Sequence, residues 1–261
     1  MLFNSIAFFV FIGIFLPVYF FLKGKPRLWL CLLGSYYFYG YLFPHFLSLI
    51  LISTLVDYGV GLMLDKETDE KRRKQLLFLS LIVNLGFLAY FKYFNFFVGS
   101  FQEVLLSIGI TPSFNLLHII MPAGISFYTF QSMSYTIDVY YKKIPVEKDF
   151  IKFATFISFF PQLVAGPIVR AKEFLPQFSM DKKFNWDRFN SGMGQVIWGF
   201  FKKLVVADSL APFIEQCFNA PETFSSMHLL MGVIFYSFQI YCDFSGYSDI
   251  AIGLALSLIH I

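Results

Sequence analysis

Long runs of apolar residues, separated by short polar segments, constrain this chain more than any other feature of its sequence. A helix needs about 20 such residues to cross a bilayer. Charged residues make up only 14% of the chain, whereas a typical soluble domain carries about 25%. Too few charges remain to cover a water-exposed surface, so we predict that the outer surface faces lipid. The candidate spans are Leu2–Leu22, Leu28–Phe43, Phe46–Leu64, Leu76–Val98, Leu116–Tyr141, Gly192–Ala207 and Met227–Cys242.

These runs predict an all-α fold, a polytopic transmembrane helical protein, because an isolated span can satisfy its backbone in lipid only as a helix. Basic residues lie in alternate connecting segments. Segments 23–27, 65–74 and 142–152 carry Lys and Arg, whereas the turn at Pro44 and the stretch 99–114 carry none. Basic loops face the cytoplasm, so we predict a multi-pass protein with its N-terminus outside.

The short apolar stretch Phe153–Gly166 interrupts this alternation. If it crossed the bilayer, the basic segment 170–188 would lie outside. Pro161, Gly166 and Pro167 disfavour a continuous helix there. We therefore predict that this stretch dips into the membrane and returns to the same side.

Several classes of function are not favoured by the sequence. The net charge is only +3, and no Lys/Arg-rich face with interleaved aromatic residues occurs, so nucleic acid is not an expected partner. Cys31, Cys217 and Cys242 lie too far apart to suggest a metal site or a set of disulfides. No metal site and no bound cofactor are predicted. Glycine-rich phosphate loops and nucleophile elbows are also lacking.

Polar residues inside apolar spans are candidates for function because they are costly in lipid. Gln131, Ser134, Tyr135 and Asp138 follow at i, i+3, i+4 and i+7, so they share one helical face. This face has two interpretations, contact between helices or the wall of a cavity.

Basic residues near the predicted cytoplasmic side form a second group. Arg170 ends the segment GPIVR at 166–170, where it is either a topology signal or a group that meets an anionic donor. Lys202 and Lys203 are adjacent in an apolar stretch, so they lie at the inner interface or beside a hydrated cavity. Lys92 is interpreted as snorkelling to the interface and His118 as an interfacial histidine.

The segment DFSGYSD at 243–249 follows an apolar span and carries two carboxylates. Asp243, Ser245, Tyr247 and Asp249 could form an acid/base pair or a cation site. Alternatively, Ser248 or Asp249 could be the N-cap of a new helix.

Four motifs in this order resemble the membrane-bound O-acyltransferase family, specifically its bacterial alginate O-acetyltransferase branch. They are PAGISFYTFQ at 122–131, GPIVR at 166–170, WGFFKK at 198–203 and DFSGYSD at 243–249. The resemblance covers essentially the whole chain. It implies a helical membrane enzyme with a funnel-shaped fold, here incomplete, in the plasma or inner membrane of a bacterium.

The resemblance also implies a reaction. Family members pass an acyl group, here expected to be acetyl, from a cytoplasmic thioester such as acyl-CoA or acetyl-CoA towards a hydroxyl on the other side. In this branch a partner of the SGNH-hydrolase type outside the cytoplasm completes transfer to an exopolysaccharide or cell-wall polysaccharide. The essential histidine of the family belongs to an Arg-Arg-Trp-His-type motif downstream of DFSGYSD, so we expect it beyond residue 261.

Residues 1–255 are therefore interpreted as the N-terminal part of a single transmembrane domain, inactive by itself. Leu256–Ile261 can be encoded by a string that matches a transposase-based sequencing adaptor, so we interpret 256–261 as a non-native tail and His260 as no catalyst. Two alternatives stay open at this point: D-alanyl transfer to teichoic acid, and a polytopic transporter or flippase.

Overall fold

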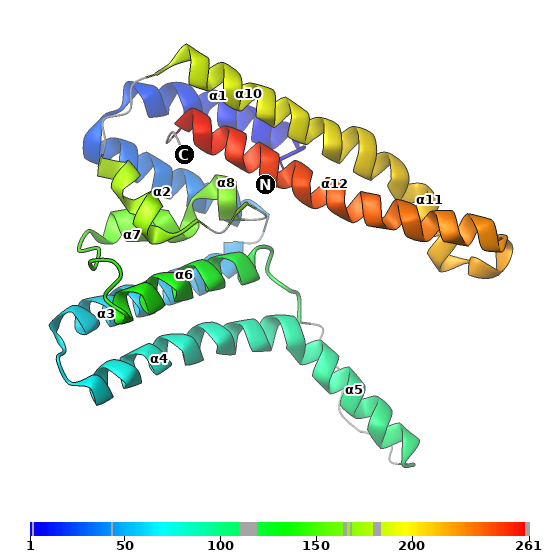
Figure 1. Cartoon of the computed structure of the whole chain (residues 1–261), viewed down its shortest axis with the longest axis horizontal. Helices are drawn as coiled ribbons and strands as arrows, with labels where there is room; N and C mark the ends of the chain where they lie inside the picture. Colours follow the sequence, from blue (N-terminus) through cyan, green and yellow to red (C-terminus); the bar gives the residue numbers. More distant parts are fainter. Residues whose placement is uncertain are drawn as a thin grey trace. The chain divides into compact units, whose positions relative to one another are not determined.

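The computed structural model describes residues 1, 3–42, 44–109, 119–163, 166–167, 169–179 and 184–258, and over these residues it is helical without strands (Figure 1). The α-helices are α1 (Ile6–Phe21), α2 (Gly24–Gly40), α3 (Leu47–Lys66), α4 (Glu70–Leu88), α5 (Phe94–Ser107), α6 (Ile125–Tyr140), α7 (Phe150–Ser158), α8 (Phe160–Leu163), α9 (Ala171–Phe174), α10 (Trp186–Phe200), α11 (Asp208–Asn219) and α12 (Ser226–Leu258). Three 3-10 helices among the described residues are η1 (Pro44–Phe46), η3 (Leu175–Ser179) and η5 (Pro221–Thr223). Two π-helical segments are η2 (Ala89–Tyr93) and η4 (Phe201–Ala207).

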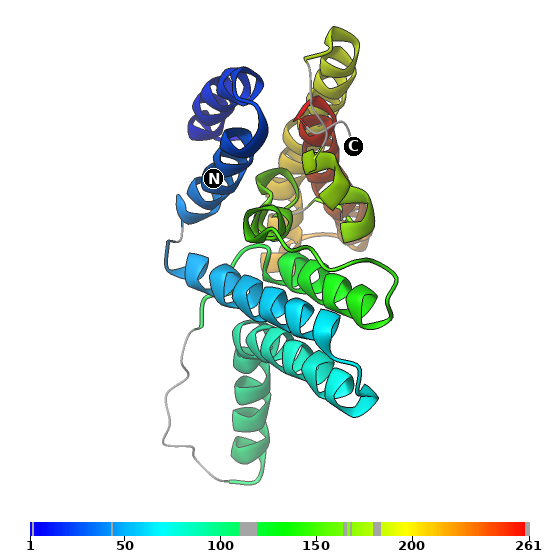
Figure 2. The same ribbon diagram turned by 90° about the vertical axis from the view of Figure 1, so that its left-hand side faces the viewer.

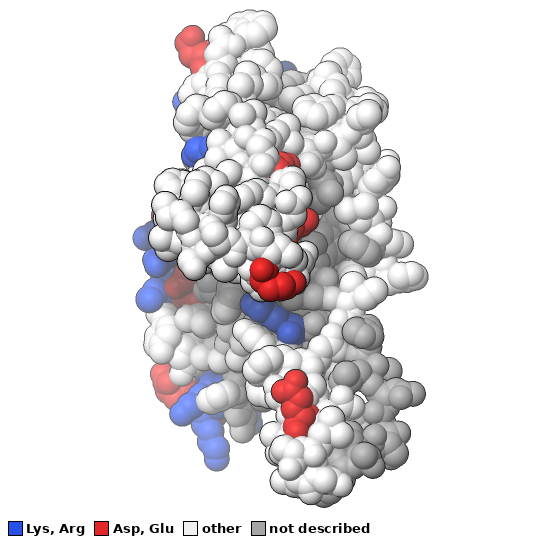
Figure 3. Space-filling view, turned by 90° about the vertical axis from the view of Figure 1, so that its right-hand side faces the viewer, with Lys and Arg blue, Asp and Glu red and all other residues white. Residues whose placement is uncertain are grey.

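Within the described residues, three helical stretches are long and apolar enough to cross a membrane: Pro44–Lys66, Glu70–Ser107 and Ser226–Leu258. The helix α1 is apolar but has only 16 residues, which span about 24 Å at 1.5 Å per residue. Large apolar side chains are exposed along many helices, and the face in Figure 3 is largely uncharged. The prediction of an all-helical, multi-pass membrane protein is confirmed.

The bounds of several predicted spans were wrong. The span predicted to end at Val98 continues through η2 into α5, so the predicted outer stretch 99–114 is helical as far as Ser107. The chain bends between α4 and α5 (Figures 1 and 2). Residues 110–118, which include His118, lie outside the described residues. The segment 208–226, between the predicted spans Gly192–Ala207 and Met227–Cys242, contains α11.

The stretch predicted to dip into the membrane is not one helix. The helix α7 ends at Ser158, α8 occupies Phe160–Leu163, and Val164 and Ala165 lie outside the described residues. The regular hydrogen bonds of the helix are interrupted between Ser158 and Phe160. The backbone N–H of Phe160 donates instead to Ser35 Oγ at 3.1 Å. The predicted break in the helix is confirmed.

The chain divides into two compact units. Unit 1 contains Met1–Phe38, Phe159–Ile168 and Pro176–Ile261. In it, α12 runs back alongside α10 and α11 (Figure 1). Its core includes an aromatic cluster in which the rings of Phe11, Phe15 and Phe38 lie 5.2–5.4 Å from the ring of Phe160.

Unit 2 contains Tyr39–Ser158 and Val169–Leu175. The helices α3, α4 and α6 pack side by side in it (Figures 1 and 2). The Asp69 carboxylate caps α4 by accepting hydrogen bonds from the backbone N–H groups of Lys71 and Arg72, each at 3.3 Å. The helix α6 begins after Gly124, whose φ of 76° suits glycine.

Candidate functional site

A cluster of charged side chains lies in unit 1 between the π-helical segment η4 and helix α12. Lys202 and Lys203 come from η4, and Asp243, Ser245 and Asp249 come from α12. A π-helical turn carries an extra residue, and such turns are frequent at functional sites. The structure therefore brings together most of the residues that the sequence singled out in this half of the chain.

Lys202 is fixed by two partners on α12. Its ammonium donates to Asp249 Oδ2 at 2.6 Å and to Ser245 Oγ at 2.9 Å. Both Lys202 and Asp249 have side chains that are only 18% exposed. The side-chain amide of Gln195 donates to the other oxygen of Asp249 at 3.4 Å. Gln195 was not among the predicted site residues; it lies on α10, seven residues before Lys202 and so on the same helical side.

Lys203 lies between two carboxylates. Its Nζ is 2.5 Å from Asp243 Oδ1 and 2.8 Å from Asp208 Oδ1, and it lies 5.4 Å from the centre of the Tyr247 ring. The lysine is 16% exposed, whereas each aspartate is 43% exposed. Asp208, the first residue of α11, was also missed because the sequence places it in a predicted loop.

Glycines allow the two helices of this site to touch through their backbones. A Cβ on Gly199 would lie 2.6 Å from the carbonyl oxygen of Gly246, and a Cβ on Gly192 would lie 2.5 Å from that of Gly253. No real side chain fits at such distances. The close approach places η4 directly against the DFSGYSD segment of α12.

One of the alternative interpretations of DFSGYSD, that it caps a new helix, was wrong. The segment lies in the interior of α12, which continues without interruption to Leu258, so neither Ser248 nor Asp249 is the N-cap of a new helix. The helix continues because Gly246 packs against Gly199 and because lysines neutralise the carboxylates of Asp243 and Asp249. Lysine ammonium groups thus stand where a bound cation would have to stand. No group of three or more His, Cys, Asp or Glu side chains suited to a metal occurs among the described residues.

The charges of this cluster are arranged so that it can accept an anionic group. Two ammonium groups and three carboxylates are held at short range in a half-buried setting where water screens them weakly. Lys203 has two acceptors and Lys202 has both a carboxylate and a hydroxyl. Either lysine can therefore exchange one partner for an incoming anionic oxygen while the other partner keeps it in place.

The polar face of α6 lies in unit 2 and contacts α7 and the segment that connects α6 to α7. Gln131 is 3% exposed and donates to the carbonyl oxygen of Phe156 on α7 at 2.6 Å. The hydroxyl of Tyr135 accepts a hydrogen bond from the backbone N–H of Glu147 at 3.1 Å. Asp138 lies 3.9 Å from the Lys143 ammonium. These contacts fit the helix-contact interpretation better than the cavity-wall interpretation.

The remaining predicted residues have less distinctive surroundings. Arg170 precedes α9 in unit 2 with an exposed side chain that makes no capping hydrogen bond. Gly166 is needed where it stands, since a Cβ there would lie 2.3 Å from Cα of Gln162. Lys92 lies in η2, with its ammonium 3.5 Å from Ser126 Oγ and 5.4 Å from the centre of the Tyr93 ring. His260 and Ile168 lie outside the described residues.

A fully buried carboxylate in unit 2, that of Asp57 in the middle of α3, was not predicted from the sequence. It accepts hydrogen bonds from Ser80 Oγ at 2.5 Å and Asn84 Nδ2 at 2.8 Å, both on α4, and from Ser132 Oγ on α6. A signal was available, because Asp57 is an acidic residue inside the predicted span Phe46–Leu64. Its donors come from two other helices and could not be assigned without the structure.

These features define a class of protein: a multi-pass helical membrane protein whose helices carry lysine–aspartate ion pairs in one unit and, in the other, a buried carboxylate that is hydrogen-bonded by neutral side chains. Comparison with known proteins gives the family. The model of the membrane-bound O-acyltransferase family matches residues 141–258, the part that contains the charged cluster. The chain belongs to this family.

Relatives extend the similarity to the whole chain. A protein of Pseudomonas aeruginosa named "Probable alginate O-acetylase AlgI" is 41% identical over 260 residues, which are 99% of this chain and 49% of that protein. The "Peptidoglycan O-acetyltransferase" of Helicobacter pylori is 35% identical, covering 95% of this chain and 53% of the relative. The "Teichoic acid D-alanyltransferase" of Bacillus subtilis is 24% identical over 55% of this chain and 36% of the relative. The chain spans about half the length of the first two.

Proposed function

We propose that this protein transfers an acyl group, expected to be acetyl, from a thioester at the cytoplasmic side of the membrane to hydroxyl groups of an extracellular polysaccharide. The observation that carries the proposal is the 41% identity over 99% of the chain to a protein named as an alginate O-acetylase. The peptidoglycan O-acetyltransferase relative supports the same reaction with a different glycan acceptor. An alginate-like or a cell-wall polysaccharide is therefore the expected class of acceptor.

The proposed membrane is the inner or plasma membrane of a bacterium, with the N-terminus outside. The alternation of basic and uncharged loops supports this orientation. In it, Arg73, Lys142 and Arg170 lie on the side where a thioester donor is produced. The donor proposed is acetyl-CoA or another acyl thioester, and an SGNH-hydrolase-type protein outside the cytoplasm is the proposed partner that completes the transfer.

The charged cluster of unit 1 is the proposed acyl-transfer site within the described residues. Transfer from a thioester creates negative charge on the carbonyl oxygen and on the leaving sulfur, and preorganised cations stabilise such charge. Lys202 and Lys203 are held rigidly, with Asp249 and Asp243 as their partners. We propose that one lysine exchanges a carboxylate partner for an oxygen of the donor. The general acid or base is the histidine expected beyond residue 261.

The test uses the full-length protein, together with its SGNH-hydrolase-type partner, in inverted membrane vesicles that enclose the polysaccharide acceptor and receive radiolabelled acetyl-CoA from outside. Base-labile label in the polysaccharide is the expected result. Replacement of Lys202 and Lys203 together, or of Arg170 by Ala, should raise the donor concentration needed for half-maximal rate more than it lowers the amount of protein. Gly194→Ala is the matched control, since nothing lies within 4 Å of a Cβ at that position.

Each outcome of this test has a defined meaning. Absence of label in the polysaccharide would contradict the proposed reaction. In parallel vesicles that receive a radiolabelled D-alanyl thioester in place of acetyl-CoA, incorporation of D-alanine would instead select the reaction named for the Bacillus subtilis relative. Transfer with unchanged donor dependence in the lysine variant would keep the reaction but remove the cluster from the donor site.

A further inference from the structure

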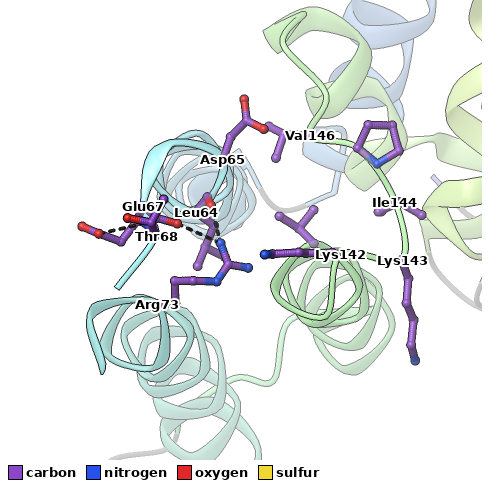
Figure 4. A pocket seen from close by; sticks show the side chains of 11 residues that line it. Leu64, Asp65, Glu67, Thr68, Arg73, Lys142, Lys143, Ile144 and Val146 are labelled. Carbon is purple, nitrogen blue, oxygen red and sulfur yellow. Dashed lines mark hydrogen bonds between the residues drawn. The ribbon is translucent and has the colours of Figure 1, made fainter. Parts of the chain in front are cut away.

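A pocket of about 470 Å³ opens at the end of unit 2 where helices α3 and α6 both terminate (Figure 4). Arg73, Lys142 and Lys143 contribute cationic side chains to its lining, and Asp65 and Glu67 contribute carboxylates. The residues of this pocket all belong to unit 2 and are separate from the charged cluster on α12.

Arg73 is nearly buried, at 5% exposure; its guanidinium lies 5.6 Å from the centre of the Tyr140 ring, and its hydrogen bonds go to main-chain oxygens. Its Nη1 donates to the carbonyl of Leu64 at 2.6 Å and to that of Glu67 at 3.2 Å, and its Nη2 donates to the carbonyl of Tyr140 at 2.7 Å. The guanidinium therefore joins the C-terminal ends of α3 and α6, where the helix dipoles favour a cation. Among the described residues no carboxylate forms an ion pair with it.

Within the described residues, the side chain of Lys142, unlike that of Arg73, is not held by hydrogen bonds to the ends of helices. The residue follows α6 with φ of 57°, the one non-glycine residue in the described part of the chain with positive φ. Glycine normally occupies such a position after a helix, since a Cβ is strained there. The ammonium of Lys142 has no hydrogen-bond acceptor or carboxylate partner among the described residues. Figure 4 shows it directed towards the Arg73 guanidinium.

The carboxylates of the pocket are already engaged elsewhere. Glu67 accepts hydrogen bonds from the backbone N–H groups of Asp69 and Thr68, each at 3.0 Å, and lies 3.7 Å from Arg72. The N–H of Asp69 is the main cause that holds the pKa of Glu67 below its usual range. The carboxylate of Asp65 lies 3.6 Å from the ammonium of Lys148, a residue that does not line the pocket. Arg73 and Lys142 thus both line the cavity, and neither forms an ion pair with a carboxylate of the described part of the chain.

We infer that the pocket binds a phosphate-type anion between Arg73 and Lys142. A phosphate accepts charge-assisted hydrogen bonds from both groups at once, which turns the repulsion between the two cations into attraction. The Thr68 hydroxyl, which also lines the pocket, can donate to the same anion. The anion can come from two sources, the headgroup of an acidic phospholipid or a soluble phosphate. This site is additional to the proposed transfer reaction and does not depend on it.

The experiment measures thermal unfolding of the purified full chain in two arms. In detergent, inorganic phosphate is titrated against chloride at constant ionic strength. In nanodiscs, phosphatidylglycerol is compared with phosphatidylcholine. A ligand that binds the folded state raises the unfolding temperature in proportion to its affinity. A rise in the first arm assigns the site to soluble phosphate, and a rise in the second arm alone assigns it to a lipid headgroup.

Two variants test the site itself. Lys142→Gln should weaken the binding about tenfold, as expected for loss of one hydrogen bond to a charged group. Lys142→Gly should lose the response equally while unfolding at a higher temperature than the wild type without anion, since glycine relieves the backbone strain. The matched control is Lys71→Gln, an exposed lysine on α4 that does not line the pocket. The inference is overturned if no anion stabilises the wild type, or if Lys142→Gln and Lys71→Gln respond as the wild type does.

Discussion

Replacement of Asp57 by Ala tests the buried carboxylate at the centre of unit 2. The substitution removes the acceptor of three side-chain hydrogen bonds, from Ser80, Asn84 and Ser132. Side-chain hydrogen bonds in membrane proteins average about 0.6 kcal/mol and reach about 1.7 kcal/mol, so three of them amount to roughly 2–5 kcal/mol. Removal of a buried charge also recovers part of its desolvation cost. We therefore expect the lower end of this range, about 2 kcal/mol.

The assay is thermal unfolding in detergent, with the folded fraction measured by size exclusion. For a chain of this size 1 kcal/mol corresponds to a shift of about 2–4 °C, so Asp57→Ala should lower the midpoint by at least about 4 °C. Asp57→Asn should lower it less, because the amide oxygen still accepts a hydrogen bond.

Asp65→Ala is the matched control for this prediction. Asp65 lies on the same helix as Asp57, but its side chain is 43% exposed and its partner Lys148 is 3.6 Å away. An exposed pair of this kind contributes about 0–1 kcal/mol. Equal midpoints for the Asp57 and Asp65 variants would refute the conclusion that burial and the three donors make Asp57 important for stability.

Three further predictions use the same unfolding assay. Gly199→Ala should destabilise unit 1 by more than about 2 kcal/mol because its Cβ meets backbone, whereas Gly194→Ala should be neutral or stabilising; equal effects would contradict the close approach. Lys202→Met and Asp249→Asn should each destabilise the protein, with a double-mutant coupling of about 1–3 kcal/mol; additive effects would show that the pair does not interact. Lys142→Gly should stabilise the anion-free protein by about 1 kcal/mol, and a loss of stability would show that the left-handed backbone costs nothing.

The helical membrane class could be predicted from the sequence because a single physical rule decides it. A chain with few charges and long apolar runs must satisfy its backbone internally, and helices do so locally. Helix ends were less predictable. An apolar run indicates where side chains prefer lipid, but it does not indicate where a helix ends. The helix α12 continues beyond its apolar half because its second half packs against protein, with Gly246 and Gly253 at the contact.

The partners within the candidate site were beyond sequence analysis for a related reason. Lys202 and Asp249 are 47 residues apart in the chain, and their contact depends on how α10 packs on α12. Each residue could be selected because it is a charge near an apolar span. The pairing, and the addition of Gln195 and Asp208, required the structure.

The two units satisfy the carboxylates of their helices in different ways, and this difference bears on which carboxylates a charged ligand can approach. Asp57 is satisfied by neutral hydroxyl and amide donors and is fully buried, so a ligand has neither access to it nor a cation to recruit. In unit 1 the carboxylates are satisfied by lysines, and Lys203 has two of them as partners. An arriving anion can replace one carboxylate there without leaving the lysine unpaired, and the released aspartate, 43% exposed, can be solvated by water. The free-energy cost of replacing a hydrogen-bond or ion-pair partner by a ligand is therefore low at the lysine cluster and high at Asp57. This asymmetry favours unit 1 as the place of the proposed donor chemistry and favours a structural role for Asp57.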